Sequence, residues 1–297
     1  MAYCLGITGV DPIAENLMFE RFLNAECDTI SFSVRIDVEK GSKKLLVDYA
    51  SDKYGNGMPM LLEMMDILIK EWVELSIIKD TIKNISSSKG KKIDLAGIDK
   101  NDPTVFELLL SSDIEGISCF DKDTALYEAI SPKNMDDLMA AITLDRPLPE
   151  EYVGKYLCNI KNPQYINYEC SELAPILSTT YGCVIYQEQV MRILQDIGGF
   201  STEKSDLCRR DLSKRKSSTI GNMREDFVYG AISSKTIGAD TANTIFDELW
   251  DEARYCFNKS HVAAFSLMIY EMAWLKAYFR LEFMEAVEKY RGMKSDI

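Results

Sequence analysis

Residues 187–212 read Q-E-Q-V-M-R-I-L-Q-D-I-G-G-F-S-T-E-K-S-D-L-C-R-R-D-L, and the expected fold class follows from this stretch. Apolar residues recur at helical spacing from Gln187 to Ile197 and again from Thr202 to Leu212. The pair Gly198-Gly199 between them is typical of a helix stop. The stretch therefore predicts two consecutive helices, and the sequence on either side continues the helical pattern.

Further helices are predicted after residue 100. They span Asp102 to Leu110, Ser131 to Ile142, Glu172 to Leu177, Asp240 to Trp250 and Ala263 to Tyr290. Pro103 and Pro132 favour two of the starts, because proline suits the first turn of a helix. The segment Arg146-Pro147-Leu148-Pro149 interrupts the pattern, and Gly238 is a further stop. The second part of the chain is therefore expected to be mainly helical.

The first 85 residues have a different pattern. From Thr29 to Val38 apolar and polar residues alternate, the period-2 signature of a half-buried strand. Helices are predicted from Asp11 to Leu23 and from Lys43 to Lys53. Residues 60–85 are rich in apolar side chains and fit a helix, a strand followed by a helix, or one long helix.

A polar run from Ser86 to Lys92, S-S-S-K-G-K-K, is the best candidate for a linker. We therefore predict three parts, which are residues 1–85, a linker over residues 86–100, and a mainly helical part over residues 101–297.

The composition is that of a folded protein. Of the 297 residues, 46% are hydrophobic, enough to bury a sizeable core, and we assign Trp274, Tyr278 and Phe279 to it. No apolar run approaches the roughly 20 residues that a bilayer span needs. The first residues lack the basic flank and the long apolar stretch of a signal peptide. We expect a cytoplasmic protein without membrane contact.

Cysteine and histidine content excludes several classes of site. The eight cysteines include no C-x-x-C pair, which argues against a zinc ribbon or a redox motif. In a reducing cytosol they are expected to act as small buried hydrophobes. His261 is the single histidine, so most histidine-based metal sites are excluded.

The net charge of −13 opposes nucleic-acid binding, because phosphate contacts normally need a basic surface. Basic residues nevertheless crowd one stretch of the chain. They are Lys204, Arg209, Arg210, Lys214, Arg215 and Lys216. Only Glu203, Asp206 and Asp211 interleave with them, so the stretch predicts either a locally positive face or a solvated helix and loop.

Longer strings carry a more specific signal. They are T-Y-G-C-V-I-Y-Q-E-Q-V-M from Thr180, D-L-C-R-R-D-L-S-K-R-K from Asp206, Y-C-F-N-K-S-H-V-A-A-F from Tyr255 and A-W-L-K-A-Y from Ala273. In this order and spacing they resemble the fingers of C-family DNA polymerases, the alpha subunits of bacterial DNA polymerase III. Upstream, A-Y-C-L-G-I-T-G-V-D-P from Ala2 and L-M-F-E-R-F-L-N from Leu17 resemble the palm of that family.

The resemblance implies an α+β fold, with a small, eroded palm sheet of the nucleotidyltransferase type over residues 1–85 and a larger, mainly helical fingers region. It also implies a role in DNA replication, with DNA and deoxynucleoside triphosphates as ligands and Mg²⁺ as the cofactor of an active enzyme. The family's glycine- and serine-rich phosphate loop, its N-terminal PHP domain and its C-terminal modules are expected to be missing.

Metal binding is where the sequence departs from the family. DNA synthesis uses two Mg²⁺ ions held by carboxylates, and the family's D-x-D pair aligns with Ser31 and Ser33, whose hydroxyls are neutral. Asp37 lies about 13 Å further along the predicted strand, too far to replace them. Asp66 is the best match to the third carboxylate, although a surface or helix-capping role fits it equally well.

The same resemblance assigns the phosphate-binding residues. Arg209 and Arg210 match the paired arginines expected to contact the triphosphate, and Lys259 and His261 match the N-K-S-H motif of the same surface. Arg21 matches a palm arginine. Two lysines, Lys214 and Lys216, fit a basic strip beside the nucleic acid.

Structural explanations remain open for these residues. The two arginines could form a solvated helix end, and His261 could cap a helix starting near Val262. A carboxylate beside Arg210, that of Asp211, is expected to weaken anion binding.

Two functions follow. In the first hypothesis, the chain is a divergent, catalytically impaired DNA polymerase that acts alone or with a complementing chain. Alternatively, it is a non-catalytic pseudo-polymerase that binds DNA, nucleotide or a replisome partner, or the remnant of a mobile-element or phage gene.

Overall fold

A computed structural model describes residues 73–117, 124–234 and 237–291. These residues form two compact units. Unit 1 contains residues 73–117, 133–135 and 263–291, and unit 2 contains residues 124–132, 136–234 and 237–262. Both are helical in the part of the chain that is described, where the β pairing found is one parallel bridge between Tyr186 and Phe257. None of the described helices is long and apolar enough to cross a membrane.

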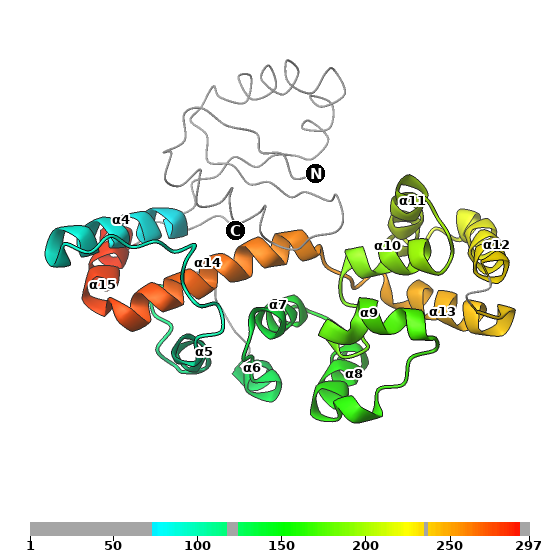
Figure 1. The fold of residues 1–297 in the computed structure, drawn as a ribbon, viewed down its shortest axis with the longest axis horizontal. Coiled ribbons are helices and arrows are strands. Elements are labelled where there is room, and N and C mark those ends of the chain that lie inside the picture. Colours follow the sequence, from blue (N-terminus) through cyan, green and yellow to red (C-terminus); the bar gives the residue numbers. More distant parts are fainter. Residues whose placement is uncertain (1–72, 118–123, 235–236, 292–297) are drawn as a thin grey trace, which may run out of the picture. The chain divides into compact units, whose positions relative to one another are not determined.

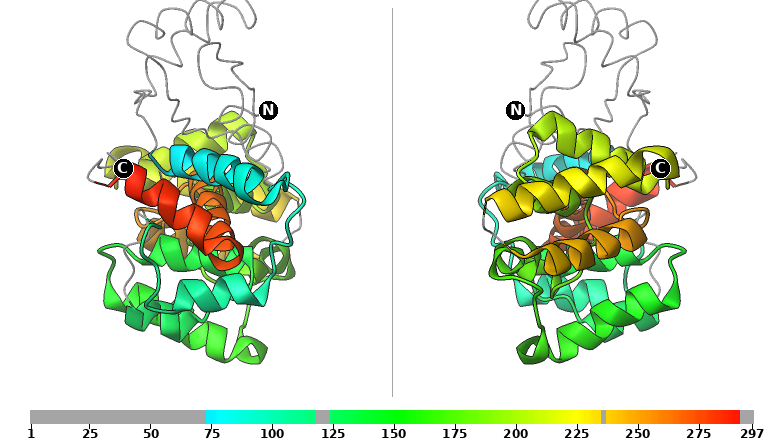
Figure 2. Two further views of the ribbon diagram at one scale, coloured as in Figure 1. Left: turned by 90° about the vertical axis from the view of Figure 1, so that its left-hand side faces the viewer. Right: turned by 90° about the vertical axis from the view of Figure 1, so that its right-hand side faces the viewer.

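Unit 1 is built from helices that are far apart in the sequence. They are α4 (Val73–Lys89), α5 (Pro103–Leu110), the later turns of α14 (Lys259–Tyr278) and α15 (Arg280–Lys289). Helices α4 and α15 lie side by side (Figure 1; Figure 2, left). Glu282 of α15 joins them, because its carboxylate accepts hydrogen bonds from Ser88 and Lys89 at the end of α4.

The start of α5 is where the sequence predicted it. Asp102 caps the helix, since its side chain accepts a hydrogen bond from the backbone N–H of Thr104 at 2.9 Å. Pro103 occupies the first helical position, where its missing N–H costs nothing. The prediction of a helix from this pair to Leu110 is confirmed.

Helix α4 continues further than the polar composition suggested. Residues 86–89 belong to its last turn, although they open the run predicted to be a flexible linker. The helix persists because tertiary hydrogen bonds to Glu282 hold Ser88 and Lys89 in place, an interaction that local composition does not reveal. Gly90 ends the helix with a positive φ of 62°.

Unit 2 consists of short helices in sequence order. They are α6 (Thr124–Ile130), α7 (Met135–Leu144), α8 (Glu150–Lys161), η1 (Pro163–Tyr165), η2 (Ser171–Leu173), α9 (Ala174–Leu177), η3 (Ser178–Thr180), α10 (Gln187–Asp196), α11 (Thr202–Ser213), α12 (Ser217–Ser233), α13 (Ala239–Glu252) and the first turn of α14. The predicted pair of helices over residues 187–212 is α10 and α11, separated by Gly198-Gly199, and is confirmed within one residue at each end.

Helices α10 to α13 share one hydrophobic core. Helices α12 and α13 run side by side (Figure 1; Figure 2, right). Phe227 of α12 is fully buried at the centre of this core, with its ring 5.6 Å from that of Phe246 and 6.3 Å from that of Phe200. The packing is close, since a Cβ built on Gly230 would lie 1.9 Å from the carbonyl oxygen of Gly198. Only glycine at residue 230 allows α12 to approach this turn so closely.

Several predicted boundaries were wrong. The helix predicted from Ala263 to Tyr290 is two helices, because the backbone of Phe279 leaves the helical region at φ −139° and ψ 48°. The helix predicted to open at Ser131-Pro132 begins at Met135, after Ser131 takes a left-handed φ of 50°. Neither break involves a glycine, which is why pattern alone did not reveal it.

The assignment of three aromatic residues to the core needs correction. Tyr278 is 49% exposed and donates its hydroxyl hydrogen to Asp102 at 2.7 Å. Trp274 and Phe279 are half-buried and their rings contact each other at 5.7 Å. These rings cover the outside of α14, so none of the three is a fully buried core residue.

The α+β prediction is supported only for its helical part. The predicted strand Thr29 to Val38, and with it the palm sheet, lies outside the described residues. The described part of the chain is helical throughout.

Candidate functional site

The two arginines predicted to bind phosphate lie on α11 and share one carboxylate. Ser201 caps this helix by accepting a hydrogen bond from the N–H of Lys204 at 3.2 Å. Arg209 and Arg210 follow Asp206 by three and four residues, so all three side chains meet on one helix face. Asp206 lies 2.6 Å from the guanidinium of each arginine. The Arg209 side chain is only 13% exposed and that of Arg210 is 55% exposed.

Gln187 fixes the position of Arg209. Its amide oxygen accepts a hydrogen bond from Nη1 of Arg209 at 3.2 Å. The backbone N–H of Gln187 donates to the carbonyl of Phe257 at 2.8 Å, beside the bridge between Tyr186 and Phe257. The first turn of α10 therefore connects α11 to the segment that leads into α14.

The next residue, Glu188, holds the start of α14. Its buried carboxylate accepts hydrogen bonds from the backbone N–H groups of Lys259 at 2.8 Å and Ser260 at 3.4 Å. Asn258 caps the third N–H group, that of His261, at 2.7 Å. The proposal that His261 caps this helix is therefore wrong, because Asn258 does so and the helix begins at Lys259. With these N–H groups occupied, an anion here would meet side chains instead of the helix terminus.

The side chain of Gln189 holds the segment that leads into α10. Its side-chain oxygen accepts hydrogen bonds from the backbone N–H groups of Ile185 and Tyr186, both at 2.9 Å. Its amide nitrogen donates to Thr180 at 2.7 Å. Because Gln189 is buried and fully engaged, the segment that positions its two neighbours is itself rigidly held.

The two residues of the N-K-S-H motif flank the same segment. The ammonium group of Lys259 lies 5.7 Å from the ring centroid of Tyr186, and the ring of His261 contacts that of Phe257 edge to face at 5.5 Å. The structure thus brings Arg209, Lys259 and His261 around Tyr186, Gln187 and Phe257.

Arg146 is a further cation of this region, and the sequence alone did not identify it. Its guanidinium donates to the carbonyls of Thr143 at 2.7 Å and Tyr255 at 2.8 Å, and lies 4.7 Å from the ring of Phe257. Burial lowers the pKa of Arg146, although a guanidinium stays charged at any physiological pH. This residue opens the segment Arg146-Pro147-Leu148-Pro149, in which only the prolines carried a signal in the sequence.

The basic stretch is strongly paired with acids. Lys204 contacts Asp226 at 2.7 Å, Arg215 contacts Asp251 at 3.3 Å and Lys216 contacts Asp211 at 2.8 Å. Lys214 is exposed. Most basic side chains of this stretch are therefore paired with acidic ones, and the net positive charge of this surface is smaller than the composition of the stretch indicated.

Asp211 does not act on Arg210 as expected. Its carboxylate accepts hydrogen bonds from Lys216 and, at 2.8 Å, from Thr219. These two bonds lower the pKa of the Asp211 carboxyl. The carboxylate that does neutralise Arg210 is that of Asp206, one helical turn earlier, where the i,i+4 spacing directs it.

The predicted metal and palm residues cannot be placed. Arg21, Ser31, Ser33 and Asp66 lie outside the described residues. Within residues 73–117, 124–234 and 237–291, no group of three or more His, Cys, Asp or Glu side chains could hold a metal ion.

Among the described cysteines, Cys183, Cys208 and Cys256 are buried, as small hydrophobes were expected to be, whereas Cys158 is exposed. Burial raises the pKa of the Cys183 and Cys208 thiols to about 12. These two thiols therefore stay protonated at neutral pH and are poor nucleophiles.

The described residues thus form a helical protein in which the paired arginines of α11 lie beside the first turn of α10. Comparison with known families agrees with the resemblance. The family described as bacterial DNA polymerase III alpha subunit finger domain matches residues 74–235. The family described as bacterial DNA polymerase III alpha NTPase domain matches residues 1–105. The chain belongs to the bacterial DNA polymerase III alpha subunit family.

Individual relatives support this assignment. The chain is 34% identical over 252 residues to DNA polymerase III subunit alpha of Helicobacter pylori strain J99, an alignment that covers 80% of this chain and 21% of the relative. It is 33% identical over 229 residues to the Thermus aquaticus protein of the same name, covering 75% and 19%. The chain thus spans about a fifth of the length of these relatives.

Proposed function

We propose that this chain supplies a fingers surface that binds the phosphates of nucleotides and DNA, and that it is impaired in catalysis. One observation carries the first half of the proposal. Arg209, Lys259 and His261, from two separate helices, contact the two segments that the bridge between Tyr186 and Phe257 joins. A planar guanidinium fixed by neighbouring side chains suits the oxygens of a phosphate.

Arg209 is poised for such a ligand. Among the described residues, its hydrogen bonds to Asp206 and Gln187 use one N–H on each terminal nitrogen. Each terminal nitrogen carries two N–H groups, so a second donor on each is available. Arg210, which is more exposed, adds charge beside it. Lys214 and Lys216 would extend the contact along the nucleic acid, and Arg21 would contribute from the palm.

The proposed impairment rests on the sequence. Serine hydroxyls at Ser31 and Ser33 lack the negative charge that Mg²⁺ requires of its ligands. Asp66 alone would be a weak metal site. When bound in such enzymes, Mg²⁺ activates the primer hydroxyl and neutralises the triphosphate, and this chain would need other carboxylates to hold it.

We further propose a palm-like sheet over residues 1–85 and a role in DNA replication, with a replisome protein or a complementing polymerase chain as a partner. The family matches over both segments support this division. A non-catalytic pseudo-polymerase, or the remnant of a mobile-element or phage gene, is the second candidate, favoured by the two serines.

Binding is tested by fluorescence anisotropy of a labelled primer–template as the salt concentration rises. We expect a salt-dependent affinity that falls at least about tenfold in Arg209→Ala/Arg210→Ala. Arg192→Ala is the matched control, because Arg192 forms a comparable i,i+4 ion pair with Asp196 at 3.2 Å on the neighbouring helix. Equal losses in both variants would contradict a specific phosphate surface.

Catalysis is tested separately by primer extension with Mg²⁺ or Mn²⁺. The unmodified chain should extend no primer, and Ser31→Asp/Ser33→Asp is the comparison that restores the two carboxylates. Extension by the unmodified chain would contradict the proposed impairment, whatever the binding assay shows.

A further inference from the structure

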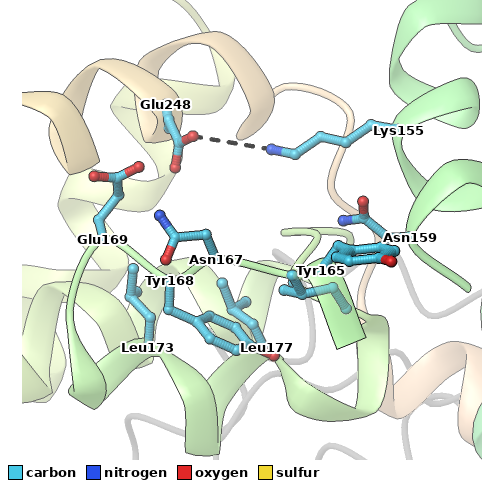
Figure 3. A pocket seen from close by; sticks show the side chains of 11 residues that line it. Lys155, Asn159, Tyr165, Asn167, Tyr168, Glu169, Leu173, Leu177 and Glu248 are labelled. Atoms are coloured by element: carbon cyan, nitrogen blue, oxygen red, sulfur yellow. Dashed lines mark ion pairs between the residues drawn. The ribbon is translucent and has the colours of Figure 1, made fainter. Parts of the chain in front are cut away.

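Unit 2 contains a cavity away from the arginine pair. It lies between α8, α13 and the loop that joins α8 to α9, and has a volume of ≈220 Å³ (Figure 3). A space of this size holds several water molecules and therefore an organic group of a few heavy atoms. None of the side chains assigned to phosphate binding lines it.

The apolar part of the cavity is built from the α8–α9 connection. Leu173 and Leu177 are buried and form part of its wall together with Ile166. The rings of Tyr165 and Tyr168 add aromatic surface, and Tyr165 is 78% exposed. These groups suit the aliphatic stem of a ligand.

Gly182 keeps one wall rigid. Its φ is +76°, and a Cβ at this position would lie 2.8 Å from the Cγ2 atom of Ile166. The loop therefore packs directly on the glycine backbone. The amide of Asn159 also ties α8 to this turn, since it donates to the carbonyl of Tyr181 at 2.8 Å. The cavity is consequently preformed.

The charges at the polar end favour a cation. Lys155 is already bound to Glu252 at 2.8 Å, whereas Glu248 lies 4.0 Å from it. Figure 3 shows Glu248 and Glu169 on the same side of the cavity, facing Asn167. Lys155 thus pairs with both Glu252 and Glu248. With Glu169 as the third carboxylate beside this one cation, the polar end keeps a negative surplus that can balance a ligand.

The environment of Glu248 agrees with this assignment. Burial raises the pKa of its carboxyl, Lys155 opposes the rise, and Glu252 and Glu169 add to it. A carboxylate whose charged form is disfavoured gains from a bound cation, because the cation replaces lost hydration. An anion such as phosphate would face the opposite balance.

We propose that this cavity binds a small organic cation, an alkylammonium or alkylguanidinium whose head lies between Glu248 and Glu169 and whose stem packs on Tyr168 and Leu173. The carboxylates supply charge-assisted hydrogen bonds, and the tyrosine rings supply apolar and cation–π contact. The inference is independent of the proposed polymerase function.

The test is an NMR titration of the ¹⁵N-labelled full chain with n-butylguanidinium at low salt, following the backbone amide of Gly182. We expect a saturable shift with n-butylguanidinium and n-butylammonium, and none with n-butanol, butanoate or inorganic phosphate. Preferential binding of butanoate or phosphate, equal shifts with butanol, or no saturable shift would overturn the proposal.

Variants locate the cation head. Glu248→Gln and Glu169→Gln keep the side-chain shape, and each should weaken n-butylguanidinium binding by about fivefold. Glu225→Gln is the control, since Glu225 is exposed on α12 and does not line the cavity. Unchanged affinity in both glutamine variants, with the remaining spectrum showing an intact fold, would exclude these carboxylates as the binding groups.

Discussion

Two clusters in this protein are built alike, since each places one aspartate between two basic side chains. In unit 1, Asp113 contacts Lys276 at 2.8 Å and also Arg280. In unit 2, Asp206 contacts Arg209 and Arg210, each at 2.6 Å. In each cluster one basic side chain is largely buried, Lys276 or Arg209, and the other is exposed, Arg280 or Arg210.

The clusters differ in how many hydrogen-bond donors are used. The side chain of Lys276 is 0% exposed, and its ammonium donates to the Asp113 carboxylate and to the carbonyls of Asp113 and Glu115, all at 2.8 Å. All three of its hydrogens are therefore used. Arg209 keeps donors and some exposure, as described above. A structural ion pair therefore differs from one able to bind a ligand in the saturation of its donors and not in the presence of a buried cation.

Removing the buried lysine should have the largest effect. Lys276→Met removes all three hydrogen bonds of this enclosed ammonium and leaves the carbonyls of Asp113 and Glu115 without their donor, while Arg280 still contacts the Asp113 carboxylate. We expect a loss of about 3 kcal/mol in the free energy of unfolding. Arg280→Met is the matched control, because this partner of Asp113 is 57% exposed and its loss should cost less than about 1 kcal/mol. Urea unfolding followed by circular dichroism measures both. Equal losses would remove the distinction between the two cations.

The packing beneath α11 should be almost as sensitive. Gly230→Ala places a Cβ against the carbonyl of Gly198, in the turn that leads into α11, and should cost about 2 kcal/mol by overpacking. Gly221→Ala on the same helix meets open space and should stabilise by about 0.5–1 kcal/mol through helix propensity. Thermal unfolding compares the two. A stabilising Gly230→Ala would mean that α12 is not seated on this turn.

A conservative substitution of Arg209 tests whether its guanidinium binds phosphate. Arg209→Lys keeps the charge but loses the planar fork that reaches both Asp206 and Gln187. We expect the affinity for a deoxynucleoside triphosphate to fall about tenfold, with little change in unfolding. Isothermal titration calorimetry measures the affinity. Arg210→Lys, at the more exposed position, should lose less, and a reversed order would show that Arg210 is the principal contact.

Acid should act mainly on unit 1. Hydrogen bonds from Arg280 and then Lys276 lower the pKa of Asp113 to about 2, and those from Lys89 and then Ser88 lower the pKa of Glu282 to about 2. Because both pKa values are depressed by folding, the stabilisation is complete above the unfolded values near 4 and is lost as pH falls towards 2.

Urea unfolding between pH 6 and pH 2 checks this dependence. The change in stability below about pH 4.5 should be smaller in Asp113→Asn/Glu282→Gln than in the unmodified chain. Glu285→Gln, an exposed change on the same helix as Glu282, should leave the dependence unaltered. An unaltered dependence in the double variant would mean that other carboxylates govern acid unfolding.

The sequence predicted helix ends correctly where neighbouring residues fix them. Asp102-Pro103 and the pair Gly198-Gly199 define helix ends through groups within a few residues. The predicted helix ends were wrong at Phe279, where the backbone kinks, and at Ser86–Lys89, where the distant carboxylate of Glu282 holds the helix. At the site, the strings around Arg209 and Lys259 identified the cations but gave no reason to select Gln187 or Glu188.

The family, the helical character of the described residues after 101 and the identity of the cations all follow from the sequence alone, because they depend on residue order and local periodicity. Which basic side chains keep unused N–H donors depends instead on the tertiary structure. Asp206 neutralises Arg210, Asp211 turns to Lys216, and Glu188 occupies the start of α14. Such pairings depend on distances between side chains on separate turns and helices, and the free energy of packing the whole unit fixes those distances.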